Sequence, residues 1–319
     1  MEKRPLIMDC DPGQDDAIAI LMAIAFPERF DILGITTVSG NVSLEKTTTN
    51  ALKTCELAGR TDIPVYAGCS RHLVNDAFHM DEDLHGETGL GGTELPDPET
   101  KVQKEHAVDF LIEAILASPK KVTLAVTGPQ TNIAMALIKD PRIKGNIEEI
   151  IFMGGALEES NITPSAEFNM YLDPEACRVV FTSGVKLTML PLDITHKLLT
   201  SKTRLEKIRA VGNKQAEAVY SMLAFTEEYD MKRYGMDGGP VHDPSVLAFM
   251  LKPELFEGKD VYVTMDLNGE YTRGRTVIDW FDLTNTTPNI YVIRDGDVDG
   301  FFDLIIDCLK RYSTGAVAA

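Results

Sequence analysis

Short apolar runs of strand length recur along the first two thirds of the chain, at residues 5–8, 31–38, 64–67, 121–126, 147–153 and 186–191. Between them lie stretches whose apolar residues recur at helical spacing, at 17–25, 43–58, 106–117, 130–138 and 173–184. Strands that alternate with helices through short turns are typical of a mainly parallel sheet with helices on both faces. The pattern therefore predicts an α/β fold.

The last third of the chain changes character. Residues 201–232 are mostly helical by spacing, and Pro244 at a first helical position predicts a further helix. Residues 261–265 and 271–279 predict a hairpin across 267–269, followed by a strand at 289–293 and a closing helix at 300–312. Linkers, repeats and low-complexity segments are absent from the sequence. We therefore expect one domain over residues 1–319, built on a single open sheet.

Composition narrows the class of protein. The chain has 319 residues, of which 44% are hydrophobic, and no run approaches the ~18 apolar residues of a membrane span. The N-terminus lacks a signal-peptide core, and the five cysteines have no paired spacing, so we expect a cytoplasmic protein without zinc or disulfides. A formal net charge of −18 argues against nucleic acid as a partner. A small neutral or cation-assisted substrate fits better.

The candidate chemistry begins at residues 9–17, Asp-Cys-Asp-Pro-Gly-Gln-Asp-Asp-Ala. Four carboxylates, those of Asp9, Asp11, Asp15 and Asp16, follow a predicted strand and a Pro-Gly turn. Carboxylates this close raise one another's pKa or bind a cation, and an all-oxygen set suits calcium or magnesium. The structural alternative is a helix N-terminus rich in acids, which the helix dipole favours.

Two other readings of this segment are weaker. An EF-hand loop that starts at Asp9 needs a glycine at position 14 and a glutamate at position 20, where the chain has Gln14 and Ile20. The Asp-x-Asp after a strand also resembles the nucleophile loop of haloacid-dehalogenase-like phosphatases. Pro12 and Gly13 replace the small polar continuation of those enzymes, so an aspartate-based phosphatase remains only an alternative.

Polar or glycine-rich segments follow several predicted strands, at 39–41, 127–129 and 153–155, and they should meet at one edge of a parallel sheet. The segment 159–169 adds two carboxylates and two amides, the mixture that binds a polyhydroxylated ligand. The segment 81–92 is either a binding loop or a solvated excursion, and Asp243 before Pro244 is either a helix N-cap or part of the site.

These motifs together resemble the inosine-uridine type nucleoside hydrolases, which cleave ribonucleosides to ribose and free base. The resemblance covers nearly the whole chain and rests on residues 9–17, 39–41, 85–90, 127–129, 153–155, 161, 166–169 and 241–244. It implies a Rossmann-like single domain, a bound calcium ion, a small ribonucleoside substrate and a homotetramer or homodimer. A calcium-dependent nucleoside or ribose binder without catalysis is the alternative from another functional class.

The same resemblance implies residue roles. Calcium would be held by Asp11, Asp16, the main-chain carbonyl of Thr127, and Asp243, with Asp11 also the general base. Ribose would be bound, and the water oriented, by Asp15 and Asn41 on one side and by Asn161, Glu167 and Asn169 on the other. Because the sugar diol completes the metal site, 2′-deoxynucleosides should react poorly.

The base side is predicted less closely. Met153 and Phe168 would line the pocket, while His85 and His242 would face the base, and protonation of the leaving base by His242 is a hypothesis. Tyr229 and Tyr234 on a late helix either close over the base or are ordinary surface and core residues. The similarity favours uridine and cytidine, with inosine as a further substrate. Gln14 is expected to point away from the metal.

Overall fold

The computed structural model describes residues 3–76 and 85–317. Its strands are β1 (Arg4–Cys10), β2 (Phe30–Thr37), β3 (Val65–Ala67), β4 (Val122–Val126), β5 (Ile147–Met153), β6 (Leu187–Leu190), β7 (Phe256–Met265), β8 (Thr276–Asp279) and β9 (Ile290–Gly296). Its α-helices are α1 (Gln14–Ile24), α2 (Leu44–Ala58), α4 (Ala107–Ala117), α5 (Thr131–Lys139), α6 (Phe168–Leu172), α7 (Pro174–Phe181), α8 (Leu192–Thr195), α9 (Lys202–Arg209), α10 (Lys214–Tyr234), α11 (Pro244–Leu251) and α12 (Val298–Arg311). Two short 3-10 helices lie at Pro141–Asn146 and Pro253–Leu255.

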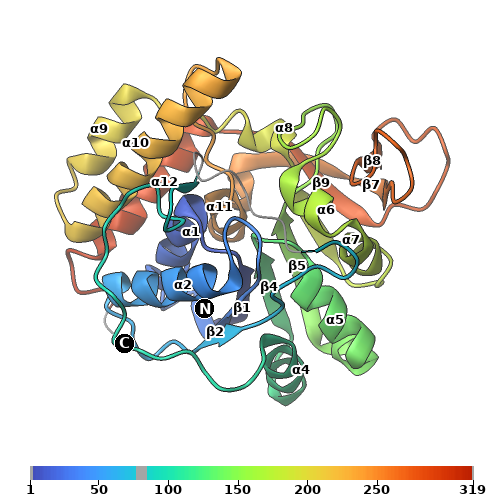
Figure 1. The fold of residues 1–319 in the computed structure, drawn as a ribbon, viewed down its shortest axis with the longest axis horizontal. Helices are drawn as coiled ribbons and strands as arrows, with labels where there is room; N and C mark the ends of the chain where they lie inside the picture. The colour runs from blue at the N-terminus through green and yellow to red at the C-terminus, as the bar shows by residue number, and fades with distance from the viewer. Residues whose placement is uncertain (1–2, 77–84, 318–319) are drawn as a thin grey trace.

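The strands form one nine-stranded sheet in the order β3-β2-β1-β4-β5-β6-β9-β7-β8. The pairs from β3 to β9 are parallel, and β7 and β8 extend the sheet as antiparallel strands. Helices cover both faces (Figure 1). One hydrophobic core packs α1, α2 and α9 to α12 against the sheet, and a second packs α4, α5 and α7 against the other face. The predicted α/β class and mostly parallel sheet are confirmed.

The strand order reverses between β1 and β4, which lie side by side although more than a hundred residues separate them in the chain. In open α/β sheets a ligand binds outside the carboxyl ends of the strands at such a switch point. The segment after β1 carries the acidic motif, and the segment after β4 carries Thr127. The topology therefore places the acidic motif and the segment with Thr127 at the position where a ligand is expected.

The hairpin prediction was partly wrong. The second strand begins at Thr276 rather than at residue 271, because Asp266 closes a longer turn. Its carboxylate accepts hydrogen bonds from the N–H groups of Asn268 and Gly269 and from the hydroxyl of Thr272. The sequence also missed the four-residue helix α8, which is too short to have a period.

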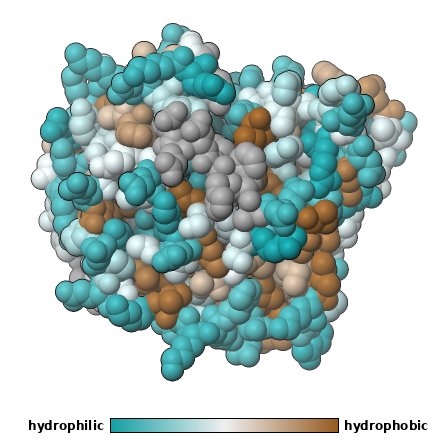
Figure 2. Space-filling view, viewed as in Figure 1, coloured by the Kyte–Doolittle hydropathy of each residue, from teal (hydrophilic) through white to brown (hydrophobic). Residues whose placement is uncertain are grey.

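The structure describes only part of the predicted 81–92 loop. Residues 81–84 of the predicted 81–92 loop lie outside the described residues, and the description resumes at His85. The expectation of one domain over residues 1–319 stays a prediction. Among the described residues no helix is long and apolar enough to span a membrane. Hydrophilic residues cover much of the face shown in Figure 2, where hydrophobic residues lie in separate patches.

Candidate active site

The acidic motif forms a tight loop between β1 and α1. Asp16 lies in the first turn of α1, where its Oδ2 atom accepts a hydrogen bond from the N–H of Gly13 at 3.0 Å. Its Oδ1 atom accepts one from the N–H of Asp11 at 3.3 Å and one from the hydroxyl of Thr127 at 2.7 Å. Asp16 therefore ties the end of β1, the start of α1 and the end of β4 together.

Asp11 is completely buried at the centre of this loop. Its Oδ2 atom accepts a hydrogen bond from the N–H of Asn41 at 2.7 Å, whereas its Oδ1 atom has no hydrogen-bond partner among the described residues. Glycine residues are required on both sides of the Asp11 carboxylate. A Cβ atom at Gly40 would lie 2.0 Å from Oδ2, and one at Gly128 would lie 2.6 Å from Oδ1. The chain thus makes room for a buried carboxylate whose Oδ1 atom has no donor within residues 3–76 and 85–317.

Asn41 bridges the two acids. Its side-chain amide donates to the main-chain carbonyl of Asp11 at 3.2 Å and to the Oδ2 atom of Asp16 at 3.1 Å. It follows β2, so a third strand end joins those of β1 and β4. The predicted meeting of these three segments at one edge of the sheet is what the structure shows.

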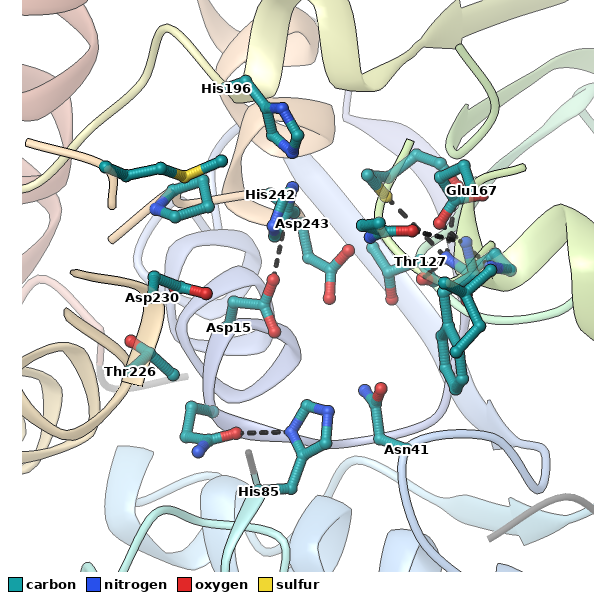
Figure 3. Close-up of a pocket in the computed structure, with 18 of the residues that line it drawn as sticks. Asp15, Asn41, His85, Thr127, Glu167, His196, Thr226, Asp230, His242 and Asp243 are labelled. Atoms are coloured by element: carbon teal, nitrogen blue, oxygen red, sulfur yellow. Dashed lines mark hydrogen bonds between the residues drawn. The ribbon is translucent and has the colours of Figure 1, made fainter. Parts of the chain in front are cut away.

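Asp243 joins the cluster from the far end of the chain. It occupies the N-cap position of α11, but its side chain makes no capping hydrogen bond, so the simple capping interpretation does not apply. Its N–H donates to Asp15 at 3.3 Å. The carboxylates of Asp15, Asp16 and Asp243 bring ligand oxygens within 4.8 Å of one another. Figure 3 shows Asp15 and Asp243 side by side in the pocket.

This crowding has an electrostatic cost. Burial, followed by the charge of Asp16, raises the pKa of Asp15 to about 6 and raises that of Asp11 well above its usual range. Burial and the neighbouring aspartates raise the pKa of Asp243 in the same way. Among the described residues that line the pocket there is no lysine or arginine. The donor set fits a hard divalent cation, since such ions prefer oxygen ligands and would favour the ionised carboxylates.

A second polar group lies across the pocket. Glu167 caps α6, and its carboxylate accepts hydrogen bonds from the N–H groups of Gly155, Asn169 and Met170 at 2.9, 2.9 and 3.1 Å. Burial nevertheless raises its pKa to about 7. The side-chain amide of Asn169 donates to the main-chain carbonyl of Thr127 at 2.8 Å. Hydrogen bonds therefore connect Glu167 and Asn169 with Thr127 at the end of β4.

Three imidazoles line the pocket. Nδ1 of His242 lies 2.8 Å from the hydroxyl of Thr195, and Nδ1 of His85 lies 2.7 Å from Oε1 of Gln14. Burial lowers the pKa of His242 to about 3 and that of His85 to about 4, so both rings are neutral near pH 7. Gln14 lines the pocket and holds His85, and the expectation that it points away from the metal stays a prediction. The third ring, His196, was missed.

Helix α10 supplies one wall. Leu223, Thr226 and Asp230 face the pocket at the spacing i, i+3 and i+7. Tyr229 lies on the same helix but is not among the lining residues, and the side chain of Tyr234 lies outside the described part. Their proposed contact with the base stays a prediction. The helical spacing places Leu223, Thr226 and Asp230 on one face of α10. Nothing in the sequence says that this face, rather than another, points into the pocket.

The pocket collects most of the predicted residues. Its empty space, which includes open solvent at the mouth, is about 960 Å³. The predicted residues that line it are Asp15, Asn41, His85, Thr127, Met153, Asn161, Glu167, Phe168, Asn169, His242 and Asp243. Asp11 and Asp16 are fully buried beside them. The residues that sequence reasoning missed include Ser160, Ile162, His196, Leu223, Thr226, Asp230, Met236 and Pro240.

Comparison with known proteins agrees with this geometry. A family model described as inosine-uridine preferring nucleoside hydrolase matches residues 6–303. The pyrimidine-specific ribonucleoside hydrolase RihA of Enterobacter sp. (strain 638) is 42% identical over 310 residues, which cover 97% of this chain and 98% of that protein. RihA of Escherichia coli (strain K12) is 43% identical, with 97% and 99% covered.

A solved structure gives the same answer. The purine-preferring ribonucleoside hydrolase from Gardnerella vaginalis matches with a TM-score of 0.89 at 34% identity, and the match covers 99% of this chain and 100% of that one. The strand order, the acidic cluster and the pocket thus agree with similarity over nearly the full length. The chain belongs to the inosine-uridine preferring nucleoside hydrolase family, and it is a glycosidase that acts on N-glycosyl compounds.

Proposed function

We propose that this enzyme hydrolyses the N-glycosidic bond of ribonucleosides to ribose and free base, with calcium at the acidic cluster and a preference for uridine and cytidine. The observation that carries the proposal is the buried Oδ1 atom of Asp11, which has no hydrogen-bond partner in the described part of the chain. It lies beside Asp16, one of three aspartates whose ligand oxygens come within 4.8 Å of one another.

Asp11, Asp16, Asp243 and the main-chain carbonyl of Thr127 are the groups that would hold the cation. A calcium ion held there would supply positive charge that favours the ionised form of a nearby water and attracts the sugar hydroxyls. These four groups offer carboxylate and carbonyl oxygens, which supports a hard cation rather than zinc.

Asp11 acts as the general base. Asn41 holds the Oδ2 atom and the main-chain carbonyl of Asp11, so Oδ1 remains to accept the proton of the attacking water. The water oxygen bonds to C1′ while the bond from C1′ to the base nitrogen breaks, and that electron pair leaves with the base. Positive charge that develops on the sugar ring is stabilised by the surrounding carboxylates.

The sugar is held from two sides. Asp15 and Asn41 bind the 2′ and 3′ hydroxyls or orient the water, while Asn161, Glu167 and Asn169 bind the 3′ and 5′ side. Glu167 and Asn169 are already fixed by hydrogen bonds to main-chain groups. Groups held this way need little reordering when substrate binds, which supports their role in positioning.

The base lies between His242, His85 and the ring of Phe168. The preference for pyrimidines is supported by the RihA relatives, which are 42% and 43% identical to this chain and are described as pyrimidine-specific. The purine-preferring relative from Gardnerella vaginalis is 34% identical. An apolar wall alone discriminates weakly, so the polar groups around the base decide the preference.

The test measures ribose release from uridine, cytidine, inosine, adenosine and deoxyuridine. It compares the wild type with Asp11→Asn and with Asp31→Asn, a control with the same change at an exposed position of β2. We expect cleavage of uridine and cytidine above the purine nucleosides, poor cleavage of deoxyuridine, and a loss of about 10³-fold in kcat for Asp11→Asn. Asp31→Asn should match the wild type.

Calcium is tested in the same assay by chelation followed by addition of calcium or zinc. Activity should return with calcium alone. Equal rates on deoxyuridine and uridine would contradict the assignment of the sugar diol to the metal site. Full activity of Asp11→Asn would rule out Asp11 as the general base, and silence of the wild type on the whole panel would favour a non-catalytic binder.

A further inference from the structure

His196 is an imidazole of the pocket to which the proposed mechanism gives no role. It follows α8 directly and lines the pocket beside His242, with the two ring centres 5.8 Å apart. Figure 3 shows the two rings pointing toward each other, at the end of the pocket opposite His85. The end of the pocket that holds His242 therefore carries two imidazoles rather than one.

The position of His196 depends on a loop that α8 holds in place. Both carboxylate oxygens of Asp193 accept main-chain hydrogen bonds, from Leu157 at 2.7 Å and from Glu158 at 3.0 Å. The N–H of Leu192 donates to the carbonyl of Gly155 at 2.9 Å. The segment after β5 is thus bound to the same short helix that ends at His196.

This loop brings one carboxylate to His196. Oε2 of Glu159 lies 3.4 Å from Nδ1 of His196, while the preceding acid, Glu158, pairs with Arg294 at 2.6 Å. The His196 side chain is only 11% exposed, whereas that of Glu159 is 51% exposed. The pair therefore connects the inside of the pocket with solvent.

The three imidazoles have different partners at Nδ1. His85 has an amide oxygen of Gln14, and His242 has the hydroxyl of Thr195. Within the described part of the chain, only His196 of the three has a carboxylate at hydrogen-bonding distance. A carboxylate at Nδ1 fixes the tautomer, directs Nε2 to the opposite side, and stabilises the imidazolium form.

The charged groups around His196 also affect its protonation. Burial lowers the pKa of His196, but the carboxylates of Glu159 and Asp193 act in the opposite direction. His242 also faces it, and its pKa is lowered to about 3 by burial and then by His196 and His85. Of these two rings, His196 is the one whose lowered pKa is opposed by neighbouring carboxylates.

We propose that His196, oriented by Glu159, contacts the leaving base and donates the proton that the base takes up as it departs. The inference rests on the proposed ribonucleoside hydrolysis. When the bond from C1′ to the base nitrogen breaks, the electron pair stays on the base, and the proton on Nε2 of His196 moves to the base. The water oxygen adds to C1′ and gives its proton to Asp11. Solvent then returns a proton to His196, beside the half-exposed Glu159.

The test compares two leaving groups. Uracil is a poor leaving group unless it is protonated, whereas p-nitrophenolate leaves from p-nitrophenyl β-D-ribofuranoside without a proton. Three variants are measured on both substrates: His196→Gln, Glu159→Gln and Glu158→Gln. The last is a matched control, because it makes the same change at the neighbouring acid that pairs with Arg294 instead.

We expect His196→Gln to lower kcat on uridine by about 10²-fold and to change kcat on the aryl riboside by less than about 3-fold. Glu159→Gln should lower kcat on uridine by about 10-fold and leave the aryl riboside nearly unchanged. It should also move the alkaline limb of the uridine pH profile to lower pH, because loss of a carboxylate lowers the pKa of His196. Glu158→Gln should match the wild type.

Other outcomes overturn the inference in distinguishable ways. Equal losses on both substrates in His196→Gln and Glu159→Gln would mean that the pair only supports the pocket structurally. Unchanged uridine cleavage in His196→Gln would mean that another group supplies the proton. A wild-type enzyme that cleaves neither substrate would overturn the proposed hydrolysis itself, and this inference with it.

Discussion

The floor of the pocket consists of Asp11, Asp16, Asn41 and Thr127, and α10 supplies one wall. The floor residues are joined by many hydrogen bonds, whereas the wall has few. On the floor, Asp16 accepts hydrogen bonds from the main-chain N–H of Asp11 and Gly13, from the Asn41 side chain and from the Thr127 hydroxyl, all between 2.7 and 3.3 Å. On the wall, the buried carboxylate of Asp230 has no hydrogen bond or ion pair within the described part of the chain and shares the surface with apolar side chains.

We interpret the floor as the part of the pocket that binds ribose, which all ribonucleosides share. The wall is then the part that faces the base, which differs among them. The floor fixes its own geometry before substrate binds, as a site for one invariant group, the ribose, requires. The wall makes few internal bonds, so its residues can change without disturbing the floor. Relatives of this chain differ in base preference: RihA is described as pyrimidine-specific and the Gardnerella vaginalis enzyme, with a TM-score of 0.89 to this chain, as purine-preferring.

The most severe test of the floor is Gly40→Ala. The added Cβ atom would lie 2.0 Å from Oδ2 of Asp11, so the carboxylate must move. A displacement of about 1 Å of a catalytic group costs on the order of 10²-fold in rate, and we expect at least that loss in kcat on uridine. Gly145→Ala is the control, because a Cβ atom there has no heavy atom within 4 Å.

The result also tests the division between floor and wall. Gly40→Ala should lower the rates on all ribonucleosides by a similar factor, since it alters only the part that every substrate shares. A variant that retained wild-type rates would contradict the assignment of Asp11, and one that lost activity on a single base would contradict the separation of the two regions.

Removal of the cation should make the fold less stable, because the buried aspartates of the pocket then lie close together without a positive charge. Burial raises the pKa of Asp15 from 3.8 to about 6, and those of Asp11, Asp16 and Asp243 also rise. Groups with a raised pKa stabilise the fold while protonated, and this contribution is lost as pH increases from about 4 through about 6. The chelated protein should therefore lose stability over this window.

Bound calcium should remove that loss, because it favours the ionised carboxylates. At 1,000 times its Kd, a ligand stabilises a fold by about 4 kcal/mol, which for a chain of this size corresponds to roughly 5–10 °C in Tm. Tm measured from pH 4 to pH 8 with EDTA and with calcium should diverge as pH increases. Parallel curves would show that the acidic cluster does not bind the ion.

The floor could be predicted from the sequence and the wall could not, for a physical reason. Asp11, Asn41 and Thr127 each follow a strand of a parallel sheet, so one rule of topology brings them together whatever the rest of the chain does. Asp230 and His196 are placed by the packing of α10 and by the four-residue α8, which depend on tertiary contacts. The prediction from the sequence therefore named Tyr229 on this helix, whose contact with the base stays a prediction, and did not name Asp230.

The smallest predicted effect concerns base preference and tests the wall alone. An ionised Asp230 can only accept hydrogen bonds, which suits the amino group of cytosine and opposes the O4 acceptor of uracil. Asp230→Asn should lower the ratio of kcat/KM for cytidine over uridine by roughly 10-fold, the value of one hydrogen bond to a charged group. Asp237→Asn, the same change at an exposed position outside the pocket lining, should leave the ratio unchanged.

The same residue predicts a pH dependence of that ratio. Burial, followed by the charge of Asp15, raises the pKa of Asp230 to about 7. Below pH 7 the protonated carboxyl can donate to O4 of uracil, and above pH 7 the carboxylate accepts from cytosine, so the cytidine-to-uridine ratio of the wild type should increase with pH through about 7. In Asp230→Asn the ratio should not change with pH. If the wild-type ratio is equally flat, Asp230 does not contact the base, and the wall acts through its apolar surface alone.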